Sequence, residues 1–373
     1  MKILLLSDTN NAHTLRWVEA LSTLGFEVGV FGLDIVKSDF YSNHPHVSVF
    51  AFDRLSKTNT VKNGGLNKLS YLFSLHQLKL IIKTFQPDIV HAHYASSYGL
   101  LGVLSGFHPL ILSVWGSDVF CFPKVSPIHK YTLKWILRNS DYILSTSKVM
   151  ATETAKYTSK MISITPFGID CQLFSPSKEG KKEDRTFIVG CTKTLAPIYG
   201  IDILIKAFAV ISHDIDAKLK LLGEGPSYLE LKQLTEKLNI SDKVEFLGRK
   251  PIAELPYYYN DFDVAVYLSK SESFGVVALE AMACECPLIV SKAAGFIEVV
   301  PSEAGIFIDC EDVQAVAESL RLLYKNKELR KKMGAKGRKY VTAQYQWKEN
   351  VDTMVNIYNG IFVNYFNKCK ITD

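Results

Sequence analysis

Residues 271–287 read SESFGVVALEAMACECP. This stretch follows the apolar run FDVAVYLS (262–269) and leads into a helix, a strand-to-helix unit typical of α/β proteins. Gly275 lets a ligand approach the backbone closely. The amides after Ser273 stand at the helix start, where the positive end of the helix dipole favours an anion. The pattern therefore predicts that a diphosphate docks at this turn.

Two carboxylates, Glu272 and Glu280, flank the middle of this stretch. Eight residues at helical rise span about 12 Å, close to the length of a nucleotide sugar. One carboxylate can then accept hydrogen bonds from sugar hydroxyls and the other from ribose hydroxyls. The alternative is that both are solvated glutamates on a helix surface. Against it, Glu280 shares its helix with Val277, Ala281 and Cys284, and a carboxylate in apolar surroundings requires a partner.

On both sides of this stretch, short apolar runs alternate with longer amphipathic segments. Such alternation predicts parallel sheets covered by helices on both faces. The predicted strands are Lys2–Ser7, Glu27–Leu33, Val47–Ala51, Asp88–His93, Leu110–Trp115, Asp141–Thr146, Met161–Thr165, Thr186–Cys191, Leu219–Leu222, Lys243–Leu247, Phe262–Tyr267, Pro287–Ser291 and Gly305–Ile308. The predicted helices are Thr14–Leu24, Leu66–Phe85, Ala95–Ser105, Ser126–Asn139, Lys148–Tyr157, Ile201–Ile211, Tyr228–Leu238, Gly275–Ala283, Val313–Tyr324, Glu328–Gln344 and Trp347–Phe366.

A polar break, SPSKEGKKEDR (175–185), reads as a linker between two domains. We therefore predict two doubly wound, Rossmann-like α/β lobes. Residues 1–174 form the first lobe, 186–345 form the second, and 346–373 form a C-terminal helix that packs back toward the first lobe. Ligands of such sheets bind beyond the carboxyl ends of the strands, so we expect the site in a cleft between the lobes.

Length and composition agree with two globular lobes: 373 residues, 47% hydrophobic and 22% charged. The whole formal charge of +5 falls within residues 1–175, which hold 16 Lys and Arg against 11 Asp and Glu. A basic first half suits an anionic partner, such as a phospholipid surface or a lipid phosphate. The alternative is ordinary solubility charge.

The cysteines and the N-terminus bear on the compartment. Seven cysteines without any C-x-x-C spacing indicate reduced thiols used as small hydrophobic residues. The apolar run in MKILLLSDTNN is too short for a signal peptide, and no stretch of about 18 apolar residues follows. We therefore expect a cytoplasmic protein, at most peripheral at the inner face of the membrane, with no nucleic-acid partner.

Further segments carry a family resemblance along nearly the whole chain. They are PDIVHAH (87–93), SVWGSD (113–118), ILSTS (143–147), TPFGID (165–170), YGIDILIKAF (199–208), LLGEGP (221–226), VEFLG (244–248) and AAGFIEVV (293–300). Together with the 272–280 segment, they resemble glycosyltransferase family 4, a retaining family with the two-lobed GT-B fold and an E-x7-E motif.

The resemblance implies an enzyme that moves a sugar from a nucleotide-sugar donor to a glycan or lipid-linked saccharide, in envelope polysaccharide biosynthesis. The first lobe would bind the acceptor and the second the donor. No cofactor and no metal are expected, because protein cations and helix amides take the metal's place. The implied donor contacts in the E-x7-E segment are Glu272, Ser273, Phe274, Gly275, Val276 and Glu280.

Two loops of the second lobe extend the implied donor site. The family usually places an Arg and a Lys in the loop after the lobe's first strand. Here Lys193 takes the first position and could neutralise the departing diphosphate, but the second falls on the uncharged Tyr199, so the second cation is unassigned. Arg249 and Lys270 are substitutes; the alternative for Lys193 is a surface lysine. The turn with Gly223 and Gly225 is implied near the nucleotide base, or it is purely structural.

The first lobe offers candidates at its strand ends. Strand alternation puts His91 and His93 on one face, and the resemblance implies that His93 faces the donor sugar. Asp118 holds an acceptor hydroxyl or caps the following segment. His13 is a second candidate on the acceptor side, while its neighbour Asn11 is expected to cap a helix. The resemblance puts a histidine where this chain has Trp115.

The segment Lys124–Arg138 is basic and aromatic. It lies on anionic lipid near the acceptor, or it is a solvated face with a buried aromatic stripe. Two rival functions also stay open: a sugar-nucleotide epimerase on the same fold, and a non-catalytic two-lobed sugar-binding protein. The donor base, the sugar, the acceptor and the linkage are not readable from the sequence.

Overall fold

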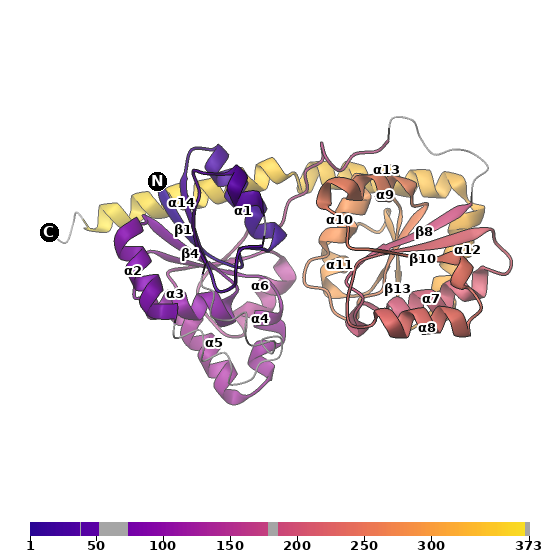
Figure 1. The fold of residues 1–373 in the computed structure, drawn as a ribbon, viewed down its shortest axis with the longest axis horizontal. Coiled ribbons are helices and arrows are strands. Elements are labelled where there is room, and N and C mark those ends of the chain that lie inside the picture. Colours follow the sequence, from indigo (N-terminus) through magenta and orange to yellow (C-terminus); the bar gives the residue numbers. More distant parts are fainter. Residues whose placement is uncertain (38, 52–73, 178–185, 370–373) are drawn as a thin grey trace. The chain divides into compact units, whose positions relative to one another are not determined.

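A computed structural model of the chain describes residues 1–37, 39–51, 74–177 and 186–369. The chain divides into two compact units, which we call the first unit (Met1–Phe167 with Glu349–Asp373) and the second unit (Gly168–Lys348). Each unit is built on one parallel sheet (Figure 1).

The first unit has a seven-stranded sheet in the order β3-β2-β1-β4-β5-β6-β7, all parallel. The strands are β1 (Lys2–Leu6), β2 (Glu27–Gly32), β3 (Ser48–Ala51), β4 (Ile89–His93), β5 (Leu110–Val114), β6 (Tyr142–Ser145) and β7 (Ile162–Ile164). The helices are α1 (Ala12–Thr23), α2 (Leu75–Phe85), α3 (Leu100–Ser105), α4 (Ser117–Phe120), α5 (Pro127–Asn139), α6 (Lys148–Ala155) and α14 (Trp347–Cys369). A π-helical turn, Ala95–Gly99, precedes α3.

Helices cover both faces of the first sheet, as near-continuous apolar strands require. Figure 1 shows α1 and α14 on one side and α2, α3 and α5 on the other. Leu78, Leu101 and Ile136 from these last three helices join a fully buried core with Leu4 and Leu112 of the sheet.

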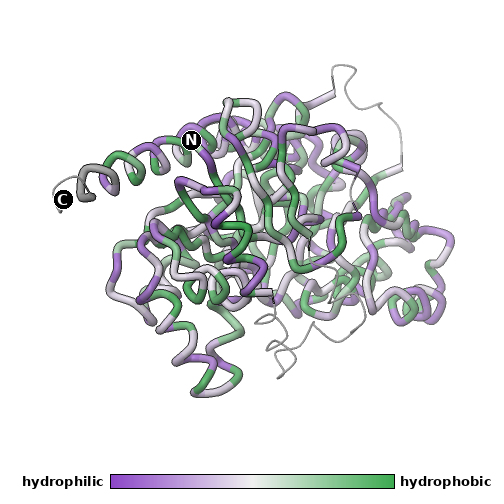
Figure 2. Tube along the Cα trace, turned by 60° about the vertical axis from the view of Figure 1, so that its left-hand side comes forward, coloured by the Kyte–Doolittle hydropathy of each residue, from purple (hydrophilic) through white to green (hydrophobic). Residues whose placement is uncertain are grey.

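The C-terminal helix α14 belongs to the first unit. Its apolar positions Val351, Met354, Tyr358 and Ile361 are buried at helical spacing. In Figure 2 hydrophilic and hydrophobic residues alternate along this helix. None of the helices in the described ranges is long and apolar enough to cross a bilayer.

The second unit has a six-stranded parallel sheet in the order β10-β9-β8-β11-β12-β13. The strands are β8 (Phe187–Thr192), β9 (Ala217–Leu222), β10 (Val244–Gly248), β11 (Val264–Tyr267), β12 (Leu288–Ser291) and β13 (Gly305–Ile308). The helices are α7 (Ile201–Ile211), α8 (Tyr228–Lys237), α9 (Leu255–Asp261), α10 (Val276–Ala283), α11 (Ala294–Val299), α12 (Val313–Lys325) and α13 (Lys327–Gln344). The central pair β8 and β11 is where the strand order reverses, the position at which such sheets bind ligands.

The boundary between the units differs from the predicted one. Residues 168–174, expected in the first lobe, belong to the second unit. Ile169 forms a β-bridge with Gln346, and the Arg338 guanidinium on α13 donates to the carbonyls of Cys171 and Phe174. These bonds fasten the segment to α13. Residues 178–185 of the predicted linker lie outside the described part of the chain. The same holds for residues 66–73 of the helix predicted at Leu66–Phe85.

Candidate active site

The centre of the candidate site is a partly buried ion pair at the carboxyl ends of β8 and β11. Lys193 follows β8 and Glu272 follows β11. Lys193 Nζ donates to Glu272 Oε2 at 2.5 Å, and the two side chains are 11% and 12% exposed. Ser269 Oγ donates to the same oxygen at 3.1 Å. Lys193 is therefore no freely solvated surface lysine, and it meets one of the two predicted carboxylates.

Aromatic rings complete the surroundings of this ammonium group. Lys193 Nζ lies 4.8 Å from the centre of the Tyr199 ring and 5.8 Å from that of Phe296. Both distances are within the range of a cation–π interaction. Tyr199, which stands where the family usually has a second cation, thus contributes a ring that faces the Lys193 ammonium group.

Gly275 forms the turn that enters α10. Its φ of +90° is in the left-handed region, and an added Cβ would lie 2.8 Å from the Phe296 ring, so both conformation and space require glycine. The Gly275 N-cap makes no side-chain cap bond. The Phe274 side chain is buried against Tyr345, so it is not exposed to a ligand. The diphosphate contacts predicted for Ser273, Phe274 and Val276 stay predictions.

Glu280 is buried on α10, so it is not a solvated helix glutamate. Tyr259 Oη donates to its Oε2 at 2.7 Å, which supplies the partner that its apolar surroundings require. Thr192 Oγ1 in turn lies 2.8 Å from the hydroxyls of both Tyr259 and Tyr267. Burial raises the pKa of Tyr259 well above its usual value, which keeps this hydroxyl a donor.

This tyrosine network was not predicted from the sequence. Tyr259 lies on α9, a short helix without clear periodicity that was not predicted. Tyr267 was visible as the one polar side chain near the end of an apolar strand. Such a buried hydroxyl needs a partner, and that was the available signal.

Gly223 and Gly225 are in close contact with the backbone of the Lys193 loop. A Cβ on Gly223 would lie 2.0 Å from the carbonyl oxygen of Lys193, and one on Gly225 would lie 2.3 Å from that of Leu195. Backbone bonds Lys193 N to Leu222 O and Leu195 N to Glu224 O join the same two loops. The geometry supports the structural alternative for this turn; its contact with a nucleotide base stays a prediction.

The two substitute cations, Lys270 and Arg249, have other surroundings than the Lys193–Glu272 pair. Lys270 forms an exposed ion pair with Glu311, with Nζ and Oε1 2.7 Å apart. Arg249 is exposed and follows β10, which is two strands away from β8. The second cation thus stays unassigned.

In the first unit, His91 and His93 project from one face of β4, as strand alternation predicts, with ring centres 4.5 Å apart. His91 Nδ1 lies 2.7 Å from Tyr358 Oη and its Nε2 lies 2.8 Å from Ser113 Oγ. His93 Nδ1 lies 3.0 Å from Ser7 Oγ. Burial lowers the pKa of His91 to about 3 and that of His93 well below its usual value. Both imidazoles are therefore neutral near pH 7.

The other nitrogen of His93, Nε2, has no hydrogen bond within the part of the chain that the structure describes. The ring stacks on Trp115 at 4.4 Å. That contact orients the imidazole and leaves Nε2 for a ligand hydroxyl. The donor-sugar contact of His93 stays a prediction.

His13 stacks on Phe167 at 4.0 Å and meets Trp115 edge-on at 6.1 Å. Desolvation and the neighbouring Arg16 charge lower the pKa of His13 to about 4, so it too is neutral. Its backbone amide donates to Asn11 Oδ1, which confirms Asn11 as the cap of α1. His13 thus joins the aromatic group around His93.

Asp118 is completely buried, and its carboxylate binds backbone amides. It accepts from Ala95 N at 2.8 Å, from Gly116 N at 2.8 Å and from Trp115 N at 3.3 Å. Burial raises the pKa of this carboxyl group, and these backbone bonds oppose the rise. These amides lie before Asp118 or at the turn Ala95–Gly99, and the N-terminus of α4 has no side-chain cap bond, so capping of the following segment is not observed; the acceptor contact of Asp118 stays a prediction.

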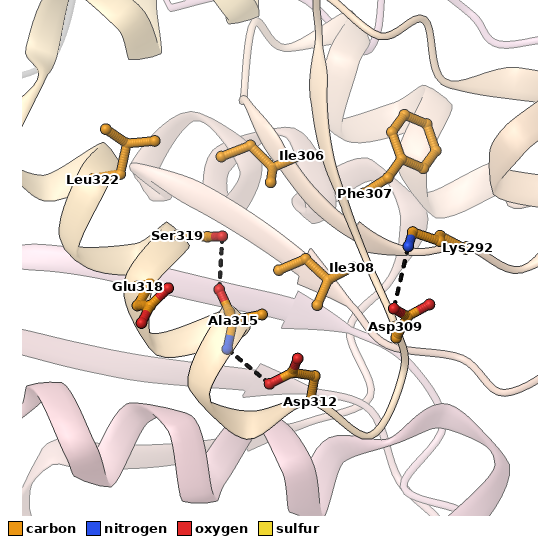
Figure 3. A pocket seen from close by; sticks show the side chains of 10 residues that line it. All are labelled: Lys292, Ile306, Phe307, Ile308, Asp309, Asp312, Ala315, Glu318, Ser319 and Leu322. Carbon is orange, nitrogen blue, oxygen red and sulfur yellow. Dashed lines mark hydrogen bonds and ion pairs between the residues drawn. The ribbon is translucent and has the colours of Figure 1, made fainter.

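An open pocket of about 520 Å³ lies at the edge of the second sheet, between β13 and α12 (Figure 3). Lys292 on its wall pairs with Asp309, and Asp312 caps α12 through Ala315 N. None of the predicted site residues lines it. Across the described ranges, no group of three or more His, Cys, Asp or Glu side chains is placed to hold a metal ion.

Comparisons with known proteins agree with the two-unit architecture. Residues 2–147 match a family model described as glycosyl transferase 4-like, and residues 174–340 match one described as glycosyl transferases group 1. An uncharacterized glycosyltransferase of Methanocaldococcus jannaschii is 30% identical over 298 residues, which are 79% of this chain and 81% of that protein.

Two solved structures share the fold. Sucrose-phosphate synthase from Thermosynechococcus elongatus matches with a TM-score of 0.82 and 22% identity, over 98% of this chain and 100% of that one. HepE of Anabaena in complex with UDP matches with a TM-score of 0.79 and 19% identity, over 96% of this chain and 100% of that one. The chain therefore belongs to the group 1, family 4-like glycosyltransferases and is an enzyme with the two-lobed GT-B fold.

Proposed function

We propose that this glycosyltransferase takes its sugar from a nucleotide-sugar donor bound by the second unit and passes it to a glycan or lipid-linked saccharide. The observation that carries the proposal is the partly buried Lys193–Glu272 pair beside the start of α10. HepE, which shares the fold, was solved with UDP bound. A cation, a carboxylate and a helix N-terminus together match the phosphates and hydroxyls of such a donor.

In the proposed reaction, the bond between the anomeric carbon and the diphosphate breaks. Negative charge grows on the departing nucleoside diphosphate, and Lys193 with the first amides of α10 receives it. Glu272 accepts from hydroxyls of the transferred sugar, and Glu280, oriented by Tyr259, accepts from the ribose. The acceptor oxygen forms the new bond to the anomeric carbon, and its proton passes to the departing diphosphate. Retention follows the family, and no residue is assigned as a covalent nucleophile.

The first unit binds the acceptor saccharide in this scheme. His93 is neutral and oriented by Ser7 and Trp115, so its Nε2 can donate to or accept from a sugar hydroxyl. His13 extends the same aromatic group and stays the candidate on the acceptor side. No metal enters the scheme, so an excess of EDTA should leave turnover within about twofold, whereas catalysis by a bound metal ion would be lost.

We place the reaction in the cytoplasm at a membrane surface, in the synthesis of an envelope polysaccharide. Support for the surface comes from the start of α5, where Val125, Ile128 and Tyr131 are 56%, 77% and 71% exposed. Exposed Lys124, Lys130 and Lys134 accompany them, and no acidic residue occurs between Asp118 and Asp141. We call these six residues the α5 surface. Apolar side chains among lysines fit the interface of an anionic bilayer.

A thermal-shift screen of nucleoside diphosphates and nucleotide sugars tests the donor proposal. A ligand at about 100 times its Kd stabilises the folded protein by about 2.7 kcal/mol, so the melting temperature should rise with one base and its sugar. Lys193→Gln should abolish most of that rise. Binding of free sugars with no response to any nucleotide would instead indicate a sugar-binding protein. Isomerisation of a donor without any acceptor would indicate an epimerase.

A further inference from the structure

The ammonium group of Lys193 is held from several sides in this structure. Glu272 Oε2 accepts its hydrogen bond, and the rings of Tyr199 and Phe296 lie 4.8 and 5.8 Å away. An ammonium group has three donors. The ring faces attract the positive charge, and among the residues that the structure describes only Glu272 accepts a conventional hydrogen bond from the ammonium group. N–H donors of Lys193 are therefore left for phosphate oxygens.

We infer that Tyr199 is the positioning residue for Lys193: its ring holds this cation of the diphosphate site in place, whereas a cation at position 199 would repel it. The inference rests on the proposed function and deepens it. It explains how a loop with one charge can serve a ligand of two phosphates: the cation is fixed in advance and loses little side-chain freedom when the ligand binds.

The loop geometry fixes the ring itself. Tyr199 ends a 3₁₀ turn, Pro197–Tyr199, and its backbone N–H donates a hydrogen bond to Ala196 O at 3.0 Å. Lys270 N donates to Ile198 O at 2.8 Å, which joins this turn to the segment after β11. The turn that carries the ring is therefore bonded to the segment that leads to Glu272 as well as to its own loop after Lys193. The Tyr199 side chain is half-buried.

The charges at the site determine the salt dependence that we expect for ligand binding. The charges of Lys193 and Glu272 neutralise each other before the ligand binds. The proposed nucleotide site therefore carries little net charge. Affinity for a diphosphate should then depend on the position of Lys193 more than on ionic strength. Tyr199→Lys should make the affinity depend strongly on ionic strength. The new lysine would repel Lys193 before the ligand binds, and the affinity would fall more steeply as the salt concentration rises.

The test measures the Kd of inorganic pyrophosphate and of UDP, GDP and ADP, together with kcat and KM for the donor. Tyr199→Leu should raise the Kd of pyrophosphate and of the bound nucleotide about three- to tenfold. Tyr199→Phe, which keeps the ring, should restore most of the affinity. Tyr199→Lys should bind with a steeper salt dependence than the wild type. Tyr258→Leu is the matched control, since this half-buried ring lies 5.8 Å from Lys250 outside the site.

A double-mutant comparison separates positioning from folding. In a Lys193→Gln background, Tyr199→Leu should have no further effect on pyrophosphate affinity, because the cation it positions is gone. Equal losses in both backgrounds, or a Tyr199→Phe variant as weak as Tyr199→Leu, would overturn the inference. Failure of the wild type to bind pyrophosphate or any of the nucleotides would instead overturn the proposed function.

Discussion

Glu272 and Glu280 have different partners, so at the scale of single residues their removal should affect different steps. Glu272 is paired with Lys193, whereas Glu280 is bound by Tyr259. Glu280→Ala should raise the Kd of the nucleoside diphosphate about tenfold or more, because it removes a charged acceptor for ribose. Glu272→Gln should lower kcat about a hundredfold with a smaller change in that Kd.

Titration calorimetry with the nucleotide and initial-rate kinetics with the donor separate the two effects. The exposed Glu230→Ala of α8 is the control and should match the wild type. Unchanged nucleotide affinity in Glu280→Ala would show that the ribose assignment is wrong.

His91 gives the first unit a pH-dependent stability. Its pKa is about 3 in the folded protein because of burial, against about 6.5 in the unfolded chain. Between those values the unfolded state binds a proton and the folded state does not, so stability falls as the pH falls. The contribution is about 2 kcal/mol lost between pH 7 and pH 5.

Urea denaturation at pH 5, 6 and 7 should therefore show a smaller loss of stability in His91→Gln than in the wild type. The imidazole signals of His91, followed by NMR in the folded wild type, should show no protonation down to pH 5. Protonation near pH 6.5 would contradict the prediction, whatever the fate of the variant.

The site also shows where single residues were predictable. Lys193 and both glutamates could be singled out from the sequence because their local settings, a strand end or an apolar helix, mark them; their donor contacts stay predictions. The contact between Lys193 and Glu272 joins residues 79 positions apart, and only the parallel order of β8 and β11 brings them together. Asp118 was ambiguous because its partners are backbone amides, which leave no trace in the residue types.

At the scale of elements, α14 is attached to the first sheet by a buried hydrogen bond between Tyr358 and His91, 2.7 Å long. Tyr358→Phe keeps the packed ring and leaves a buried imidazole nitrogen without its partner. It should lower the free energy of unfolding of the first unit by about 1–3 kcal/mol. Urea denaturation measures it, with the 73% exposed Tyr257→Phe as the control; equal stability of the two variants would contradict this role.

The α5 surface makes a second prediction at this scale. The triple substitution Lys124→Glu, Lys130→Glu and Lys134→Glu should abolish sedimentation with vesicles containing phosphatidylglycerol. Ile128→Ser with Tyr131→Ser should weaken it severalfold, since lipid binding grows with buried apolar area and with anionic attraction. Neutral phosphatidylcholine vesicles should bind little.

The matched control for that experiment is Leu229→Ser with Tyr257→Ser, two comparably exposed apolar positions of the second unit, at 68% and 73%. Binding that persists in the lysine variant, or that the control pair reduces equally, would show that α5 is a solvated face.

Most elements were predictable because buried parallel strands read as apolar runs and their helices as amphipathic segments. The structure has a strand at every predicted strand position. The exceptions were short helices: α4, α9 and α11 have four, seven and six residues. Two turns or fewer leave no periodicity to detect, and their ends are fixed by tertiary contacts rather than by helix propensity.

At the scale of the whole molecule, the division into two units follows from two sheets with separate cores. Its boundary could not be located from composition, because residues 168–174 join the second unit through Arg338 and the Ile169–Gln346 bridge. Those contacts pair residues more than 160 positions apart, which no local pattern shows.

The central claim is that the diphosphate of a nucleotide is received by Lys193 and the start of α10, with Glu280 at the ribose. A crystal structure of the protein with the nucleotide sugar selected by thermal shift tests it most directly. We expect phosphate oxygens within hydrogen-bond distance of Lys193 Nζ and of the first amides of α10, and ribose hydroxyls on Glu280. A nucleotide bound elsewhere, with the Lys193–Glu272 pair undisturbed, would contradict it.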